Sequence, residues 1–432
     1  MKLKKIALVL SLIVGVAFSA MALDSEKGLS IAGIQIEFLF FGLTLVGVAI
    51  FHHRVMYVSL TGLAVILIYK YLFTPDFSFV DHLVGNEHHE GEWRILVNLI
   101  GLLFGFAVLA KHFEESKIPE ILPKYLPDKW YGGFVLLILI FIMSAFLDNI
   151  AAAMIGGTIA MVVFKGNVHI GFLAAIIAAS NAGGAGSVVG DTTTTLMWID
   201  GVSPIAVLPA FIGAFGSLIV FGSVATIQQF KHQRIVFDSE HEHKINYKKL
   251  FVVAMILAGT ILTNYYLDFP AVGVWGGILL GAIITTTPWS ELKHAAPGSI
   301  FLTALVTCAS LMPVDELPAA SWQSALSLGF ISAVFDNIPL TKLCLDQGGY
   351  DWGVLAYAVG FGGSMIWFGS SAGVALSNMY PQCKSTGKYL KSGWHVIVAY
   401  VIGFFILLGV AGWHPDDPHR EEHQNTEQTE QH

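Results

Sequence analysis

The sequence predicts an all-α polytopic membrane protein built from two related halves. Of its 432 residues, 55% are hydrophobic and only 12% are charged, a balance that soluble domains of this size do not normally show. An Asp-Asn pair within apolar sequence occurs at 148–149 and again at 336–337, 188 positions apart (336 − 148). A glycine-rich segment follows each pair, over 181–191 and over 360–370. Composition therefore indicates the class, and the two recurrences indicate the duplication.

The first 22 residues have the composition of a targeting segment. Three lysines precede an apolar run over 6–18, and small residues end in Ala20-Met-Ala22. Two interpretations stay open: a signal peptide cleaved after Ala22, or an uncleaved extra N-terminal helix that begins in the cytoplasm. Both place residue 24 outside the cell, so both predict the same topology downstream.

Apolar segments that approach the ~20 residues of a spanning helix fill most of the remaining chain. In a first repeat over 29–230 they are 29–51, 55–73, 94–112, a broken stretch 168–198, and 205–230. A second repeat over 250–412 supplies 250–267, 271–286, 298–312, a broken stretch 353–378, and 393–412. A cytoplasmic linker over 231–249 joins the repeats, and a polar tail over 413–432 follows.

A paired segment precedes the broken stretch in each half. Residues 131–147 turn at Asp148 into 150–164, and residues 320–335 turn at Asp336 into 338–345. The last arm would rise only about 12 Å at ~1.5 Å per residue, which is too short to cross a ~30 Å hydrocarbon core. We therefore predict that each half contains five crossings, a re-entrant hairpin and a broken helix.

Five is an odd number, so the second half enters the membrane from the opposite side and the repeat is inverted. The distribution of Lys and Arg tests this scheme, because cytoplasmic loops carry more of them than external loops. Fifteen fall on the cytoplasmic side: Arg54, Lys111, Lys117, Lys124, Lys129, Lys165, Lys231, Arg234, Lys244, Lys248, Lys249, Lys293, Lys384, Lys388 and Lys391. Five fall outside: Lys27, Lys70, Arg94, Lys342 and Arg420. The asymmetry supports this orientation, with the C-terminal tail external.

Oxygen-bearing side chains gather around the two breaks. Irregular backbone is tolerated at membrane depth only where protein or a water-filled cavity satisfies its polar groups, and unwound carbonyls there can bind cations. The glycines that indicate broken backbone are Gly183, Gly184 and Gly186 in the first half and Gly362 and Gly363 in the second. The neighbouring candidate ligands are Asp148, Asn149, Asn181, Asp191, Thr192 to Thr195, Ser332, Asp336, Asn337, Ser364, Ser370 and Ser371.

This set of residues indicates cation and proton chemistry. Hard cations such as sodium prefer oxygen ligands. The matching stretches contain no Arg or Lys except Lys342, so their carboxylates have no obvious counter-charge. A carboxylate without a counter-charge in low dielectric either holds a metal cation or takes up a proton. We expect Asp148 and Asp191 to bind transported sodium or the exchanging proton, with Asp336 contributing charge.

At these motifs the chain resembles the NhaD-type sodium/proton antiporters, members of the ion transporter superfamily that also holds citrate, dicarboxylate and arsenite permeases. The resemblance covers roughly residues 30–412. It rests on Leu147-Asp-Asn-Ile150, Asn181-Ala-Gly-Gly184 leading to Gly190-Asp-Thr-Thr-Thr-Thr195, Ser332-Ala-Val-Phe-Asp-Asn-Ile-Pro-Leu340, and Gly362-Gly-Ser running to Gly369-Ser-Ser-Ala-Gly-Val-Ala375. It implies an elevator-like homodimer in the plasma (inner) membrane of a bacterium, exchanging sodium or lithium for protons.

The resemblance also implies which polar residues function. The family's functional positions map onto Asp148, Asn149, Asn181, Asp191, Thr193, Thr194, Ser332, Asn337 and Ser371. Adjacent threonine hydroxyls on a helix point in different directions, so one or two of Thr192 to Thr195 should bond back to the backbone. Gly186-Ser-Val-Val189 departs from the bulkier, proline-containing stretch expected there, which leaves the cation open.

Other functions fit the sequence less well. A coupled carrier of citrate, dicarboxylate or an oxyanion such as arsenite would need a cationic clamp, and bare carboxylates at both tips would repel an anion. A polar lock between helices, or a structural or sensor membrane protein, does not require matched breaks in both halves. The fold alone does not distinguish these function classes. The charges of the site residues do, because they favour a cation over an anion.

No enzyme, cofactor or nucleic-acid partner is predicted; the expected partners are the lipid bilayer and small cations. Gly369-Ser-Ser-Ala-Gly373 matches the nucleophile-elbow pattern but lacks its strand-turn-helix setting. Cys308, Cys344 and Cys383 lack the spacing of a disulfide framework or a zinc site. The histidine-containing runs at 86–90 and 414–423 are open to metal binding or pH sensing, although such runs are more often solvated.

Overall fold

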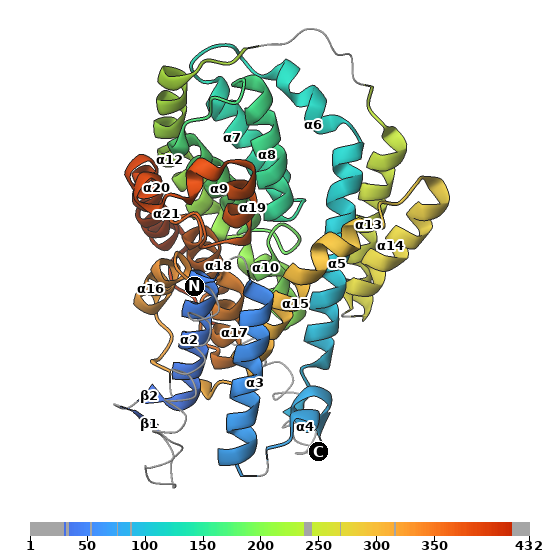
Figure 1. Cartoon of the computed structure of the whole chain (residues 1–432), viewed down its shortest axis with the longest axis vertical. Coiled ribbons are helices and arrows are strands. Elements are labelled where there is room, and N and C mark those ends of the chain that lie inside the picture. Colours follow the sequence, from blue (N-terminus) through green and yellow to red (C-terminus); the bar gives the residue numbers. More distant parts are fainter. Residues whose placement is uncertain are drawn as a thin grey trace, which may run out of the picture.

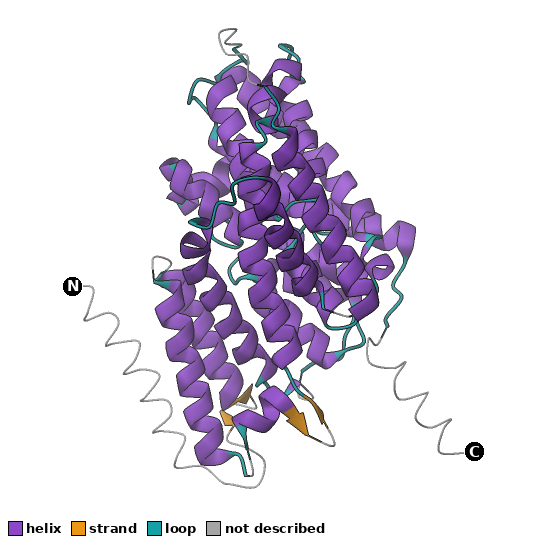
Figure 2. Ribbon diagram, turned by 90° about the vertical axis from the view of Figure 1, so that its right-hand side faces the viewer, coloured by secondary structure: helices purple, strands orange, loops and turns teal. Residues whose placement is uncertain are grey.

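The computed structural model describes residues 30–31, 34–51, 54–75, 77–86, 89–236, 244–267, 269–314 and 317–416. The predicted targeting segment, most of the polar tail and part of the linker lie outside these residues. The described chain is almost entirely helical (Figure 2). It also holds two antiparallel strand pairs of two residues each, β1 Ser30–Ile31 with β2 Ile34–Gln35 and β3 Gly85–Asn86 with β4 His89–Glu90. The predicted all-α class therefore holds apart from these short pairs.

The first half of the chain forms one continuous series of helices. They are α2 Ile36–Ile50, α3 Val55–Phe73, α4 Phe79–Val84, α5 Trp93–Glu115, α6 Ile118–Ile121, η1 Leu122–Tyr125, α7 Gly132–Ser144, α8 Asn149–Val163, α9 Ile170–Gly184, α10 Thr192–Ile199, α11 Pro204–Val207 and α12 Ala210–His232. The predicted break falls between α9 and α10, and the predicted hairpin is α7 with α8.

The second half follows a similar order. Its helices are α13 Tyr247–Leu267, α14 Pro270–Ile284, α15 Glu291–Ser310, α16 Trp322–Ser332, α17 Asn337–Gln347, α18 Trp352–Gly362, α19 Ser371–Met379, η3 Pro381–Lys384, α20 Thr386–Ser392 and α21 Trp394–Ala411. The short arm of the second hairpin is α17, and the second break separates α18 from α19.

Five stretches of the described chain are long and apolar enough to cross a membrane: α3, α5, Pro204–His232, α13 and α21. Shorter apolar helices, including α7, α8, α9, α14 and α18, lie among them. Long spanning helices together with short buried ones are the pattern expected of a polytopic membrane protein whose inner helices are shielded from lipid by their neighbours.

The helices pack in two sets (Figure 1). We call α2, α3, α5, α13, α14 and α15 the framework; within it α13 packs on α14, α5 on both of these, and α15 on α3 and α5. We call α7–α12 and α16–α21 the core, in which α9 packs against α7, α8 and α12. Contact between the sets falls mainly where α15 meets α17, with smaller contacts of α5 on α10 and α8. Both hairpins and both broken helices belong to the core.

Glycines let the broken helices approach the hairpins closely. A Cβ added at Gly183 of α9 would overlap the carbonyl oxygen of Phe141 in α7. In the second half, a Cβ at Gly362 of α18 would overlap the carbonyl oxygen of Gly329 in α16. The same separation of 188 positions relates Phe141 to Gly329, so the two halves use glycine for the same purpose at corresponding places.

Candidate functional site

The two hairpin tips are built in the same way. Asp148 caps the N-terminus of α8, where its Oδ2 accepts a hydrogen bond of 3.2 Å from the backbone N–H of Ile150. Asp336 caps α17, and its Oδ1 accepts from the N–H of Ile338 at 3.1 Å. Helix N-termini present unsatisfied N–H groups that favour a carboxylate. Each Asp therefore turns the chain and places one carboxylate at the tip.

The two breaks are also capped by polar side chains, but by different ones. Asp191 caps α10 and accepts from the N–H of Thr193 at 3.1 Å. Ser370 caps α19 and accepts from the N–H of Gly373 at 3.2 Å. In the described chain Gly369-Ser-Ser-Ala-Gly373 spans the start of α19, and a turn, not a strand, leads into it. Ser370 is the helix cap, and Ser371, the central serine of the pattern, is the first residue of the helix.

Each tip contacts the break of its own half through matching hydrogen bonds. The Thr192 hydroxyl donates to Asp148 Oδ1 at 3.4 Å, and the Ser371 hydroxyl donates to Asp336 Oδ2 at 3.4 Å. The breaks themselves are separated by 179 positions (370 − 191), and the same interval relates Thr192 to Ser371. The contacts of the two half-sites therefore correspond residue by residue.

A second pair of hydrogen bonds repeats the correspondence deeper in the core. The Ser144 hydroxyl donates to the carbonyl of Ser180 at 2.5 Å, and the Ser332 hydroxyl donates to the carbonyl of Val359 at 2.7 Å. Both serines are fully buried. Ser332 was predicted as a site residue, and in the structure its hydroxyl donates to a backbone carbonyl of the broken helix. Ser144 was not predicted, although the interval between the hairpins would have identified it from Ser332.

Asn181 joins the two half-sites. It is fully buried in α9, and its Oδ1 accepts from Asn149 Nδ2 at 3.1 Å. Its Nδ2 donates across the core to Ser364 Oγ at 2.9 Å and to Ser370 Oγ at 3.0 Å. One amide therefore connects the first hairpin tip to the second break. The structure thus brings Asn149, Asn181 and Ser370 together.

The position that corresponds to Asn181 in the second half is Gly360. A Cβ added there would lie 3.2 Å from Asp191 Oδ2, so the absence of a side chain leaves room for the Asp191 carboxylate. The sequence prediction did not include Gly360. Aligning the breaks by their interval would have placed it opposite Asn181, but its proximity to Asp191 depends on tertiary packing.

Three buried polar atoms at the site have no hydrogen-bond partner among the described residues: Asp191 Oδ2, Thr193 Oγ1 and Asn337 Nδ2. Buried polar atoms in native structures usually have a partner, so unpartnered atoms at one site indicate a place for a ligand. Two of the three atoms are oxygens, the kind of ligand that sodium prefers. Asp191 is 1% exposed, whereas Asp148 and Asp336 are half-buried.

The threonine run divides as helical geometry requires. The Thr194 hydroxyl donates to the carbonyls of Ser187 and Asp191 at 2.6 and 3.0 Å. The Thr195 hydroxyl donates to the carbonyls of Val188 and Asp191 at 2.8 and 2.9 Å. Both therefore fasten the break to the start of α10. Thr193 keeps an unpartnered hydroxyl and Thr192 reaches Asp148, so Thr192 is better placed than Thr194 to act at the site.

The lysine nearest to these residues in sequence points elsewhere. Lys342 Nζ lies 2.7 Å from Asp346 Oδ1 and 3.1 Å from Glu92 Oε1. Among the described residues, none of Asp148, Asp191 and Asp336 forms an ion pair. Asp148 and Asp336 are both close enough to act electrostatically on Asp191. Two carboxylates, those of Asp148 and Asp336, thus lie near Asp191, and none of the three has a cationic partner among the described residues.

No family model matches the chain. Among curated proteins, sodium/proton antiporter 1 of Arabidopsis thaliana is 25% identical over 337 residues, which cover 66% of this chain and 54% of that protein. The Na+/H+ antiporter NhaD of Alkalimonas amylolytica is 24% identical over 334 residues, covering 65% of this chain and 68% of the relative. The Na+/H+ antiporter NhaD of Vibrio cholerae is 23% identical over 385 residues, covering 74% of this chain and 79% of that protein. The match thus spans about half the length of the Arabidopsis protein and more of the bacterial ones. These matches confirm the resemblance that the motifs predicted, and the chain is a relative, at low identity, of the NhaD-type sodium/proton antiporters.

Proposed function

We propose that this chain is a secondary transporter that exchanges sodium, or lithium, for protons. The observation that carries the proposal is that Asp148 and Asp336 both lie near Asp191, and that none of these three carboxylates has a cationic partner among the described residues. Like charges in low dielectric are stable together only when they share a cation. Sodium and the proton both meet that need, so one site binds either ion but not both.

In the first half, Asp148 and Asp191 are proposed to bind the exchanging ion between them. The unpartnered Asp191 Oδ2 and Thr193 Oγ1 supply oxygen ligands, and Asp148, which Thr192 of the same break contacts, supplies the second carboxylate. When sodium binds, its charge offsets the repulsion between the two carboxylates. The affinity of the pair for a proton then falls, and the proton is released. Two such carboxylates titrate as one coupled pair, so the proton belongs to the pair.

In the second half, Asp336 is proposed to add negative charge without exchanging the proton. Its break carries Ser370 where the first half carries Asp191, and a hydroxyl does not release a proton near neutral pH. Ser371 and Asn337 supply further polar groups beside Asp336, and Asn181 couples the two half-sites. The site is therefore single and asymmetric.

We further propose an inverted repeat of two five-crossing halves, with the linker in the cytoplasm and the C-terminal tail outside. The corresponding hydrogen bonds at the tips and breaks support duplication, and the excess of Lys and Arg in the predicted cytoplasmic loops supports the orientation. The family resemblance adds a homodimer in the bacterial plasma membrane. Alternating access would then come from movement of the core against the framework.

The test is ion-driven proton movement in vesicles. Everted vesicles that contain the protein are acidified, and a pH-sensitive dye reports the internal pH after sodium, lithium, potassium or citrate is added. We expect sodium or lithium to remove internal protons, and Asp191→Asn to abolish that response. A response to citrate alone, with uptake of labelled citrate, would replace this proposal with the organic-acid carrier.

A further inference from the structure

A buried cluster of charges lies away from the ion site, around Lys342. The Lys342 side chain is 1% exposed, and its Nζ lies 2.7 Å from Asp346 Oδ1, 3.1 Å from Glu92 Oε1 and 3.7 Å from Asp200 Oδ1. Asp200 and Glu92 are also largely buried, with side chains 4% and 11% exposed. A lysine held by carboxylates from three separate elements has one fixed position, because each carboxylate restricts it from a different side.

The cluster crosses the boundary between the two sets of helices. Lys342 and Asp346 lie on α17, and Asp200 caps the C-terminus of α10, so these three belong to the core. Glu92 caps the N-terminus of α5 and belongs to the framework. The Lys342–Glu92 bond is the ion pair among the described residues that joins core to framework. It ends on the helix whose first residue is Asn337 of the ion site.

We infer that Lys342 is a positioning residue: its bond to Glu92 holds the core against the framework in the conformation of this structure, and transport requires that bond to open. The inference rests on the proposed function, because alternating access in secondary transporters is largely movement of one helix bundle against another around a fixed site. The ion site lies wholly within the core, so movement between the sets carries the site without dismantling it.

The Lys342–Glu92 bond can open because Lys342 has other partners. A buried lysine without any partner would strongly destabilise the protein. Lys342 would keep Asp346 and Asp200, because both travel with it in the core. Glu92 lies at the end of α5 and is the partner that would return to water. The cluster thus limits the free-energy cost of separation to one charge-assisted hydrogen bond.

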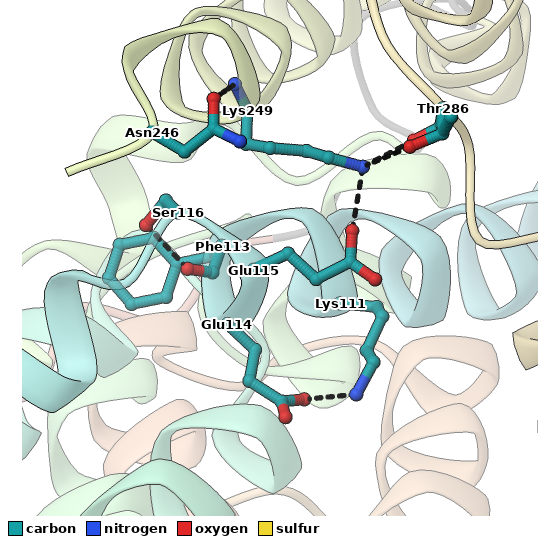
Figure 3. Close-up of polar contacts among 8 residues, drawn as sticks. All are labelled: Lys111, Phe113, Glu114, Glu115, Ser116, Asn246, Lys249 and Thr286. Atoms are coloured by element: carbon teal, nitrogen blue, oxygen red, sulfur yellow. Dashed lines mark hydrogen bonds and ion pairs between the residues drawn. The ribbon is translucent and has the colours of Figure 1, made fainter. Parts of the chain in front are cut away.

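A second buried lysine provides the contrast. Lys249 of α13 binds Glu115 of α5 at 2.6 Å and the carbonyl of Thr286 after α14, and its side chain is 5% exposed (Figure 3). All three elements are in the framework. This ion pair also has a buried lysine, although Glu115 is 38% exposed where Glu92 is 11% exposed. It does not cross the boundary, so we expect it to stay closed throughout transport.

The experiment measures the position of the core directly. Cysteines introduced at Leu72 of α3 in the framework and at Ile205 of α11 in the core, both exposed, are labelled with spin probes, and the distance distribution is recorded by pulsed electron paramagnetic resonance. The native Cys308, Cys344 and Cys383 are all buried, so the probes select the introduced sites. This readout requires no transport, so it separates failure of the inference from failure of the proposed function.

We expect Glu92→Gln to lower the ratio of this conformation to the alternative by about tenfold, the value of one charge-assisted hydrogen bond. Glu92→Asp, which keeps the charge but is one methylene shorter, should shift the ratio less in the same direction. Glu115→Gln, which removes the framework pair, is the control that should leave the distribution unchanged. Asp346→Asn removes a carboxylate that stays with Lys342 after separation, so it should not shift the ratio in the direction of Glu92→Gln.

Transport kinetics supply a second readout. If sodium/proton exchange is present, Glu92→Gln should change the exchange rate severalfold while the apparent sodium affinity stays within about twofold. The inference is overturned if Glu92→Gln leaves the distance distribution as in the parent protein, or if Asp346→Asn shifts it equally. Loss of exchange with an unchanged distance distribution overturns it as well.

Discussion

The two half-sites have the same construction and different chemistry. Asp148 and Asp336 cap equivalent helices and accept equivalent hydroxyl bonds from Thr192 and Ser371. The first half then places Asp191 at its break, where the second half places Ser370. The two halves thus share the hydrogen-bonded geometry of their tips and differ in the ionisable groups at their breaks. The difference teaches that matching backbone geometry does not imply matching chemistry, so the proposed proton exchange need not follow the symmetry of the scaffold.

The same difference between the halves accounts for the hydrogen bonds that Asn181 forms with the second break. Asn181 occupies a position where the second half has Gly360, and its amide reaches the second break instead of repeating a local contact. Gly360 in turn leaves the space that Asp191 Oδ2 faces. The two breaks are therefore joined by hydrogen bonds from Asn181 and by the close approach of Gly360 to Asp191.

The largest expected effect comes from replacing the capping group at the two breaks. Asp191→Asn should reduce sodium-dependent proton movement by at least ~100-fold, because asparagine preserves an oxygen ligand and the shape but cannot exchange a proton. Ser370→Ala should mainly raise the sodium concentration needed for half-maximal response. Dye-based assays on matched vesicles compare the two, and equal losses in both variants would show that the half-sites are chemically equivalent.

The next effect concerns the space at Gly360. Gly360→Ala places a methyl group 3.2 Å from Asp191 Oδ2, tighter than an ordinary contact, so the carboxylate must move by a few tenths of an ångström. We expect the apparent sodium affinity to fall by about tenfold and protein stability to change little, because site geometry tolerates only small displacements. The matched control is Gly276→Ala in the framework, where an added Cβ meets nothing within 4 Å. Unaltered affinity in Gly360→Ala would argue that Asp191 Oδ2 takes no part in binding.

A smaller effect is expected to distinguish the hairpin tips. Asn149 is bonded to Asn181, whereas Asn337 has an unpartnered Nδ2. Asn149→Ala should therefore destabilise the protein by about 1–3 kcal/mol, because it leaves Asn181 Oδ1 buried without a donor. Asn337→Ala should cost less stability but still weaken ion binding. Thermal unfolding with and without sodium separates the two contributions, and the reverse order of stabilities would contradict the assigned hydrogen bonds.

The smallest effects should be equal in the two halves. Ser144→Ala and Ser332→Ala each remove a buried hydroxyl that donates to the neighbouring broken helix. Each should lower the free energy of unfolding by about 1–2 kcal/mol, the loss of one buried hydrogen bond. Denaturation of both variants in the same detergent tests this symmetry. A cost confined to one serine would mean that the two hairpins are not packed equivalently.

The helices were largely predictable from sequence because each is an apolar run bounded by turn residues. The span predicted over 55–73 is α3, with the same bounds. The largest boundary errors have local causes. The first helix begins at Ile36 instead of 29, because residues 30–31 pair with residues 34–35 as two short strands. α15 begins at Glu291, whereas the predicted span began at 298. The prediction missed the first two turns because they are polar and because Pro297 lies inside the helix.

The site was predictable in composition but not in connection. The repeated Asp-Asn pairs and glycine breaks indicate segments that the structure brings into contact, and ionisable residues in apolar sequence are costly unless used. Which hydroxyl faces the carboxylates depends on the helix phase after each break, so Thr194 proved to bond the backbone while Thr192 reaches Asp148. The link from Asn181 to Ser364 joins residues 183 positions apart and follows only from tertiary packing.

The central claim is that the exchanging proton belongs to the first half-site. Purified protein in a weakly buffered detergent solution near neutral pH is mixed with sodium, and a pH indicator counts the protons released. We predict release from the parent protein and from Asp336→Asn, and none from Asp191→Asn. Release that persists in Asp191→Asn but disappears in Asp336→Asn would contradict the account and assign the proton to the second half.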